Sequence, residues 1–265
     1  MVAVKHSAML VPVFALVSAS GLCQLKTGTA PRLEFEVASI KPSNPNADGG
    51  IIKPLPGGQS YAATNVPVKL MIKLMFHLSD RQISGGPGWI ETDPYDVEAK
   101  ADGPHAIDEL HVMFQNLLID RFKLQFHKEM RTLPAYELVV DRSGPKLTEN
   151  HTPEHFDIPV TRSGFGKLEA THCSMSYFSW LLSQGLDRPV IDQTGLRQFY
   201  DFKLEWTPEP APGLAGRPDA AANLPGTNGP DIFTALREQL GLKLDSHKGP
   251  VEVMVIDHVD RPSEN

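Results

Sequence analysis

Three side chains in the second half of the chain have the types and the order of a zinc-peptidase site. His151, Glu154 and His155 form the pattern His-x-x-Glu-His, in which two histidines about one helical turn apart bind the metal and the glutamate acts as a base. The pattern requires a helix, whereas Pro153 lies inside it and Pro159 follows. We therefore expect a solvated loop whose metal binding is incidental, we assign no catalytic residue, and we expect no cofactor.

Trp89 is the side chain that we expect to contact a ligand. It lies at the exit of a Gly- and Pro-rich loop, and aromatic faces bind the apolar surfaces of sugars and peptides. The other two tryptophans, Trp180 and Trp206, fall on core-facing positions of a predicted helix and a predicted strand. Cys173 lies near a predicted helix start, where a thiolate is favoured. Since no partner base is identifiable for it, we expect a structural or incidental thiol.

The balance of charge and the absence of other motifs exclude several classes of protein. The 265 residues carry 25 Lys and Arg against 32 Asp and Glu, for a formal net charge of -7. Proteins that bind the phosphate backbone have a basic face, so nucleic acid is not an expected partner. The sequence contains no Gly-x-Ser-x-Gly elbow, no phosphate-binding loop and no His-Glu-x-x-His, which removes the usual support for an esterase, a nucleotide hydrolase or a common zinc peptidase.

Residues 1–23 have the order of a secretory signal peptide. Lys5 precedes an apolar run over residues 8–17, and small residues follow before Cys23. We expect export to the periplasm or the extracellular space. No transmembrane segment is expected after signal removal, because this apolar run is about half of the roughly 20 residues that a spanning helix needs and no other stretch of the sequence comes close. A lipid anchor on Cys23 is disfavoured, since Leu22 occupies the place of the small residue that this modification needs.

An internal repeat with a spacing of about 107 residues organises the rest of the chain. Residues 61–66 align with residues 168–173, and each block leads into a helical pattern. Further matched pairs follow in the same order: Asp80-Arg81 with Asp187-Arg188, Gly88-Trp89 with Gly195-Leu196, and Tyr95-Asp96 with Tyr200-Asp201. The predicted organisation is a first module with its preceding strand over residues 32–142, a join over 143–166, and a second module over 167–261 with a flexible Pro- and Gly-rich insertion at 207–230.

Each module is predicted to be an α+β unit of about β-α-β-β-α-β-β, a mainly antiparallel sheet with two helices packed on one face. The strand that begins at each Tyr-Asp pair alternates between apolar and polar residues, so the tyrosine should face inward and the aspartate outward into water. The second helix of each module is expected over residues 110–121 and 232–240. Two strands should then close each module as a pair, with the last pair joined by a turn at Lys248-Gly249-Pro250.

Several segments together resemble the soil-associated protein family of acidobacteria, a domain of unknown function called DUF3738. They are Phe35 to Ser43, Gly85 to Ile90, Tyr95 to Ala101, Leu118 to Leu124, Asp192 to Leu196, Tyr200 to Phe202 and Val255 to Asn265. The resemblance covers nearly the whole chain after the signal and brings no established activity, so it implies no catalytic residues. Related domains are attached to membrane metallopeptidase sensors of the BlaR type, which implies a sensing or interaction module on the envelope side.

The sequence thus favours a non-catalytic binding or protein-interaction module of the cell envelope, whose partner is an envelope protein or a small ligand. The signal sequence, the duplicated modules and the absence of complete catalytic motifs support this interpretation. The alternative is an envelope hydrolase with a site between the two modules, metal-assisted through His151, Glu154 and His155. A third hypothesis is an accessory to a membrane peptidase sensor.

Overall fold

The computed structural model describes residues 32–44, 49–152, 158–164, 166–208 and 229–262. The predicted signal at 1–23, two of the motif residues, Glu154 and His155, and most of the predicted insertion at 207–230 lie outside the described residues. Within the described ranges, none of the helices combines the length and the apolar character of a membrane span.

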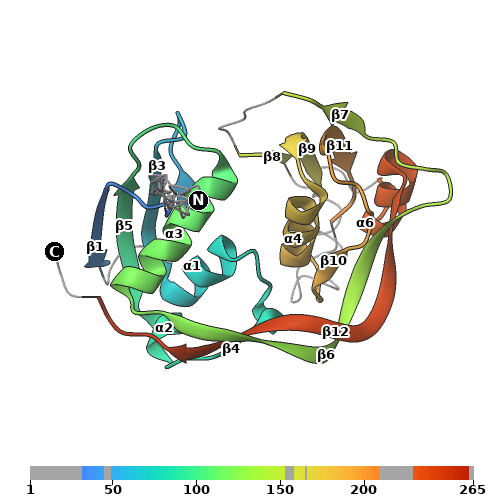
Figure 1. Cartoon of the computed structure of the whole chain (residues 1–265). Helices are drawn as coiled ribbons and strands as arrows, with labels where there is room; N and C mark the ends of the chain where they lie inside the picture. The colour runs from blue at the N-terminus through green and yellow to red at the C-terminus, as the bar shows by residue number, and fades with distance from the viewer. Residues whose placement is uncertain (1–31, 45–48, 153–157, 165, 209–228, 263–265) are drawn as a thin grey trace, which may run out of the picture. The chain divides into compact units, whose positions relative to one another are not determined.

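The first module is built on a four-stranded antiparallel sheet in the order β1-β5-β3-β2 (Figure 1). The alternation predicted along β5 is observed, because Tyr95, Val97 and Ala99 all face the first hydrophobic core. Helices α1 and α3 pack their apolar residues into the same core. The elements are β1 (Val37–Pro42), β2 (Ile51–Pro54), β3 (Ser60–Pro67), α1 (Val68–Met75), η1 (Asp80–Gln82), β4 (Ile83–Gly85), α2 (Trp89–Thr92), β5 (Pro94–Lys100) and α3 (Ile107–Arg121).

The second module repeats this arrangement around a sheet in the order β7-β11-β9-β8. Its first helix begins at Ser174, whose hydroxyl accepts a hydrogen bond from the backbone N–H of Tyr177. Its second helix begins at Asp231 and continues as a π-helical turn. The elements are β7 (Thr148–Asn150), β8 (Val160–Gly164), β9 (Lys167–Cys173), α4 (Met175–Gly185), β10 (Val190–Asp192), β11 (Phe199–Glu205), α6 (Ile232–Ala235) and η2 (Leu236–Leu240).

The repeat extends to the hydrogen bonds that hold each sheet. Asp96 Oδ1 accepts from the backbone N–H of Asn65 at 2.9 Å, and Asp201 Oδ1 accepts from that of His172 at 2.8 Å. Asn65 and His172 both have positive φ and lie where the strand register shifts. The same two carboxylates also accept from side chains ahead of each copy, Ser43 and Asn150. Asp96 and Asp201 therefore accept hydrogen bonds at the bulges, whereas plain solvated side chains were expected at these positions.

The two modules exchange strands along a ribbon made of β6 (Gln125–Val140) and β12 (Leu242–His258), which pair antiparallel throughout (Figure 1). β6 starts beside the first core and ends in the second core, where Leu138 is buried. β12 runs the opposite way and brings Ile256 into the first core. β4 and β10 add to the ribbon as parallel partners, giving the order β10-β6-β12-β4.

This pairing corrects the predicted hairpins. Instead of a turn at residues 248–250, β12 continues straight through them, and Gly249 and Pro250 pair with Leu133 and Thr132 of β6. Proline is tolerated there because β4 and β10 pair with other parts of β12 and β6. Around Gly249 and Pro250, each of the two ribbon strands therefore has one open edge. The local pattern of Pro and Gly predicts a turn, because the strand that pairs with these residues is remote in the sequence.

The fold class is α+β with mostly antiparallel sheets, as predicted, and residues 33–265 form one compact unit. The strand exchange has a consequence for the two cores. Met254, Ile256 and Val259 come from the second copy in sequence but are buried in the first core. Each core is complete only when strands from both copies are present.

Residues 32–142 produced alone should therefore fail to fold, although they contain the whole first copy. The fragment lacks the end of β12, and burial of each large aliphatic side chain contributes about 1.5–3 kcal/mol to a total stability that is typically about 5–15 kcal/mol. Circular dichroism and heteronuclear NMR spectra would show an unfolded chain, and adding a peptide of residues 242–262 should restore structure. Cooperative unfolding of the fragment alone, at the midpoint of the whole chain, would contradict the strand exchange.

Replacing Asp96 or Asp201 by alanine should lower the free energy of unfolding by about 1–3 kcal/mol in each case. The substitution leaves a backbone N–H and a side-chain donor without their acceptor at a partly buried bulge. Chemical denaturation measures the loss. Glu98→Ala, on the exposed face of the same strand as Asp96, is the matched control and should change the stability by no more than about 0.5 kcal/mol.

Candidate metal centre

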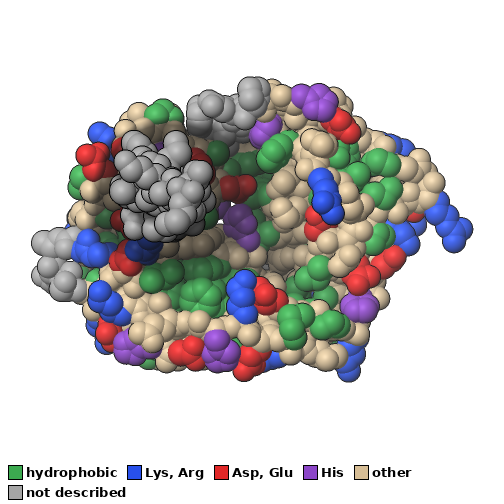
Figure 2. All heavy atoms as spheres, viewed as in Figure 1, with side chains coloured by type: hydrophobic (Ala, Val, Ile, Leu, Met, Phe, Trp, Pro, Cys, Tyr) green, Lys and Arg blue, Asp and Glu red, His purple; other side chains and the backbone are tan. Residues whose placement is uncertain are grey.

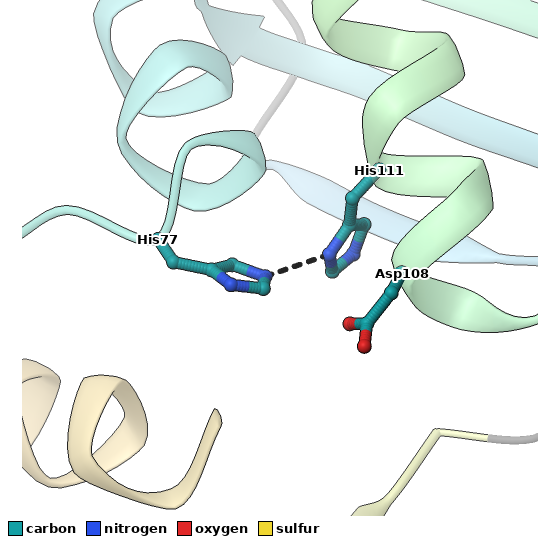
Figure 3. Close-up of side chains that lie close together, drawn as sticks. All are labelled: His77, Asp108 and His111. Carbon is teal, nitrogen blue, oxygen red and sulfur yellow. Dashed lines mark hydrogen bonds between the residues drawn. The ribbon is translucent and has the colours of Figure 1, made fainter. Parts of the chain in front are cut away.

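Three potential metal ligands converge where the end of α1 approaches α3. His77, Asp108 and His111 each offer one ligand atom, and these atoms lie within 4.8 Å of one another. Figure 3 shows the two imidazoles pointing toward each other, with the Asp108 carboxylate beside His111 on the same helix. The face of the molecule drawn in Figure 2 is hollowed near its middle, and histidine and acidic side chains lie at this hollow.

His77 is held in place by the way α1 ends. Its backbone N–H bonds to the carbonyl of Leu74, and the N–H of Leu78 bonds to the carbonyl of Lys73, which together form a Schellman motif. His77 has a φ of 53°, at the position where this motif usually has glycine. A side chain in this left-handed region costs about 1–2 kcal/mol. The chain therefore has a histidine where a glycine would fit the backbone better. A favourable interaction of the imidazole would offset this conformational free energy.

Asp108 and His111 lie one turn apart on α3, three residues from each other, so their side chains share a face of the helix. Asp108 is exposed in the first turn, where the helix dipole favours a carboxylate. His111 is only 4% exposed. Its Nδ1 lies 2.8 Å from His77 Nε2, so one of these nitrogens donates a hydrogen bond to the other.

Tyr61 on β3 completes the buried side of the cluster. Its hydroxyl lies 3.1 Å from Nε2 of His111. Histidines that bind metals usually donate their second ring N–H to a nearby acceptor, which fixes the tautomer and the ring orientation. With Nε2–H of His111 donating to the Tyr61 oxygen, the Nδ1 lone pair of His111 faces His77 and is available to a metal ion.

The surroundings keep both imidazoles neutral. Burial and, to a smaller extent, the neighbouring His77 lower the pKa of His111 to about 3. Burial also lowers the pKa of His77, although Asp108 opposes this effect. The pKa of the Tyr61 hydroxyl is raised, again mainly by burial. Two neutral imidazoles beside a carboxylate form a donor set that binds divalent transition-metal ions.

The second module covers the other side of His77. The indole of Trp180 stacks on the His77 ring with 4.7 Å between centroids and 29° between planes, and Tyr177 meets the same ring edge to face at 5.6 Å. Gln184, one turn further along α4, donates through Nε2 to the carbonyl of Leu78 at 3.1 Å. The cluster therefore lies where α4 of the second module contacts the end of α1.

The geometry fits a first-row divalent ion after a small adjustment. Two nitrogens bound to one tetrahedral zinc ion at about 2.0–2.1 Å lie about 3.3 Å apart, whereas His77 Nε2 and His111 Nδ1 are 2.8 Å apart. The rings need to separate by about half an ångström, which a rotation of the less buried His77 can provide. Asp108 would supply the third ligand, and three protein ligands leave at least one coordination position open.

The two copies of the repeat differ at this cluster. Gln184 occupies the position in α4 that His77 occupies after α1, at the same spacing of 107 residues. The Asp96 and Asp201 bulges are shared by both copies, so they belong to the framework. The His77 cluster has no counterpart at Gln184, and it is therefore a specialised feature of the first module.

Two other histidines, His105 and His127, lie in ordinary surface ion pairs. His105 places its two ring nitrogens 3.0 Å from Asp102 and 2.9 Å from Glu109. His127 lies on the ribbon between Asp257 and Glu129. In each case the two carboxylates contact different nitrogens of one imidazole. Their oxygens therefore do not converge on a common point at which an ion could bind.

The residues singled out in the sequence lie elsewhere. Trp89 begins α2, and the guanidinium of Arg261 lies 4.8 Å from the centre of its ring, so a ligand would have to displace that contact. His151 is exposed, with Nε2 3.5 Å from a carboxylate oxygen of Glu149. Its two motif partners lie outside the described residues. Ligand contact at Trp89 and metal binding at the His151 motif stay predictions.

The Cys173 thiol is buried, as a structural role requires. Burial and, to a smaller extent, Asp108 raise its pKa to about 12. The thiol therefore remains protonated near neutral pH, and it lacks the thiolate character that a helix start would otherwise favour.

The sequence interpretation did not identify His77, Asp108 or His111. Asp108 and His111 have a spacing that places both on one face of a helix, but the predicted helix began at residue 110 and so excluded Asp108. His77 is 31 residues before Asp108 in a different element, and only the tertiary fold brings it to α3.

The metal-free protein should become less stable as the pH falls from about 6.5 toward 3. In that range the unfolded His111 binds a proton and the folded one does not, so acid favours unfolding. Between pH 7 and pH 5 this group should contribute a loss of up to about 2 kcal/mol. Denaturation curves of His111→Gln should lack this part of the pH dependence.

The matched control for this pH dependence is His151→Gln, at an exposed histidine. It should keep the pH dependence of the original chain. Identical slopes in all three proteins would contradict the assignment of a buried, neutral His111.

Comparison with known proteins identifies the family. A family model described as "Protein of unknown function (DUF3738)" matches residues 69–259. The match covers more than half of the chain, so the chain belongs to this family, which confirms the resemblance found in the sequence. Neither a curated protein nor a solved structure gives a significant match. The His77 cluster lies within the matched residues.

Proposed function

We propose that this member of the family is an exported binding protein that holds a divalent transition-metal ion through His77, Asp108 and His111. The observation that carries the proposal is the convergence of three different ligand atoms within 4.8 Å, at a partly buried place against the second module. Zinc is the first candidate, because two imidazoles and one carboxylate form a usual donor set for it. The proposal departs from the expectation of no cofactor.

Tyr61 supports the proposal from outside the ligand set. A buried hydroxyl at hydrogen-bond distance from the second nitrogen of His111 is the outer contact that orients a metal-binding imidazole. Export is proposed from the signal-like order of residues 1–23. In an envelope compartment, the ion would serve to bind a partner or ligand.

A second candidate function is metal-assisted hydrolysis at the same place. The specific observation in its favour is that three protein ligands leave a position open for water, as in catalytic zinc sites. This version keeps the site near the contact of the two modules and replaces the His151 motif by the His77 cluster. Turnover of peptide or ester substrates by the zinc-loaded chain would favour it, and loaded protein without turnover favours the binding role.

Isothermal titration of the purified, chelator-treated chain with zinc should give one tight site per chain. Asp108→Ala removes an exposed ligand without opening a core, so the variant should fold and bind zinc at least about 100-fold more weakly. His77→Ala should have a similar effect. Tyr61→Phe should weaken binding by about 10–100-fold, because it removes only the outer contact.

His151→Ala is the matched control, because it removes a histidine from the other candidate metal motif. It should leave the affinity for zinc unchanged. A chain that binds no zinc, or an Asp108→Ala variant that binds it as tightly as the original chain, would contradict the proposal. Loss of binding in His151→Ala alone would instead assign the ion to the His-x-x-Glu-His loop.

A further inference from the structure

We infer that the ion held by His77, Asp108 and His111 binds a carboxylate ligand, and that the Nε1–H of Trp180 donates a hydrogen bond to that carboxylate. This inference rests on the proposed metal binding and adds the chemistry of what the loaded site captures. It joins three observations: the charge of the ligand set, the open coordination position, and an indole N–H beside His77 that has no partner among the described residues.

The charge of the loaded site favours an anion. Two neutral imidazoles and one carboxylate carry a charge of -1, and a divalent ion brings the centre to +1. An imidazole that binds a metal ion through a ring nitrogen lone pair is neutral. A single negative charge in the open position neutralises the centre, and a neutral centre is favoured in a partly buried place where charges are poorly solvated.

Trp180 supplies the donor. Its Nε1 atom is buried and has no hydrogen-bond partner within the described part of the chain, although buried indole N–H groups usually find one. The ring that carries this N–H stacks directly on His77, so the donor belongs to the surroundings of the same metal ligand. An anion bound to the ion is an acceptor that would satisfy it.

The aromatic cover makes a carboxylate with an organic group a better fit than a bare inorganic anion. Tyr177 and Trp180 both present aromatic rings to His77 from α4. A carboxylate places its oxygens on the ion and on the donor, while its organic group can contact these rings. Both free organic acids and the C-termini of peptides carry this chemistry.

The test uses the whole chain loaded with cobalt(II), whose visible absorption reports changes in its ligands. Titrations with acetate represent a free acid, and titrations with an N-acetylated dipeptide represent a peptide terminus. Both carry the carboxylate, so we expect each to shift the cobalt spectrum in a saturable way, and the tighter one identifies the source. The amide of the same dipeptide lacks the carboxylate and should have no effect.

Trp180→Phe keeps a ring to stack on His77 but removes the N–H. It should bind cobalt within about twofold of the original chain and bind the carboxylate roughly tenfold more weakly, as expected for one lost hydrogen bond. Trp206→Phe is the matched control, since it makes the same change at an indole that packs on the second core, and it should change neither affinity.

The outcomes separate this inference from the proposed function. A chain that takes up no cobalt contradicts both. A chain that takes up cobalt but shows no spectral response to either carboxylate contradicts the inference alone. Equal carboxylate affinities in Trp180→Phe and the original chain would overturn the role of the indole, and so would an equal loss of carboxylate affinity in Trp206→Phe.

Discussion

The pairing of β6 with β12 carries each of these strands from one hydrophobic core into the other, so neither module can be completed from its own copy of the repeat. This constraint holds the two modules together through backbone hydrogen bonds and buried side chains. It also brings α4 of the second module against the end of α1, where Trp180 stacks on His77. The candidate metal centre depends on that contact, although all three of its ligands come from the first module.

Comparing the two copies of the repeat distinguishes contacts that both copies share from features that only one copy has. Both copies hold a bulge with an aspartate that accepts from a residue of positive φ, Asn65 in one and His172 in the other. Such repeated contacts serve the stability of the sheet. His77 in the first copy corresponds to Gln184 in the second copy. His77 has a strained backbone conformation at the end of α1. Because His77 is present in one copy only, it points to a specialised role more than to a contact that folding requires.

Much of the fold could be predicted from the sequence, because the alternation along β5 and β11 and the helical patterns are local signals. The Tyr-Asp repeat located both strands and the correct buried face. The strand exchange could not be predicted in this way, since Gly249 and Pro250 have the local character of a turn and only a partner remote in sequence, Leu133 and Thr132, shows them to be strand. The candidate metal centre could not be predicted for a similar reason, because His77 and His111 meet only through tertiary packing.

Anomalous diffraction from crystals of the zinc-loaded chain tests the central claim most directly, because it locates the ion. The account predicts one strong zinc peak per chain, within bonding distance of His77 Nε2, His111 Nδ1 and an oxygen of Asp108, with Tyr61 still in contact with His111. A well-occupied zinc site at His151, or the absence of a peak beside His77 in zinc-saturated crystals, would contradict it.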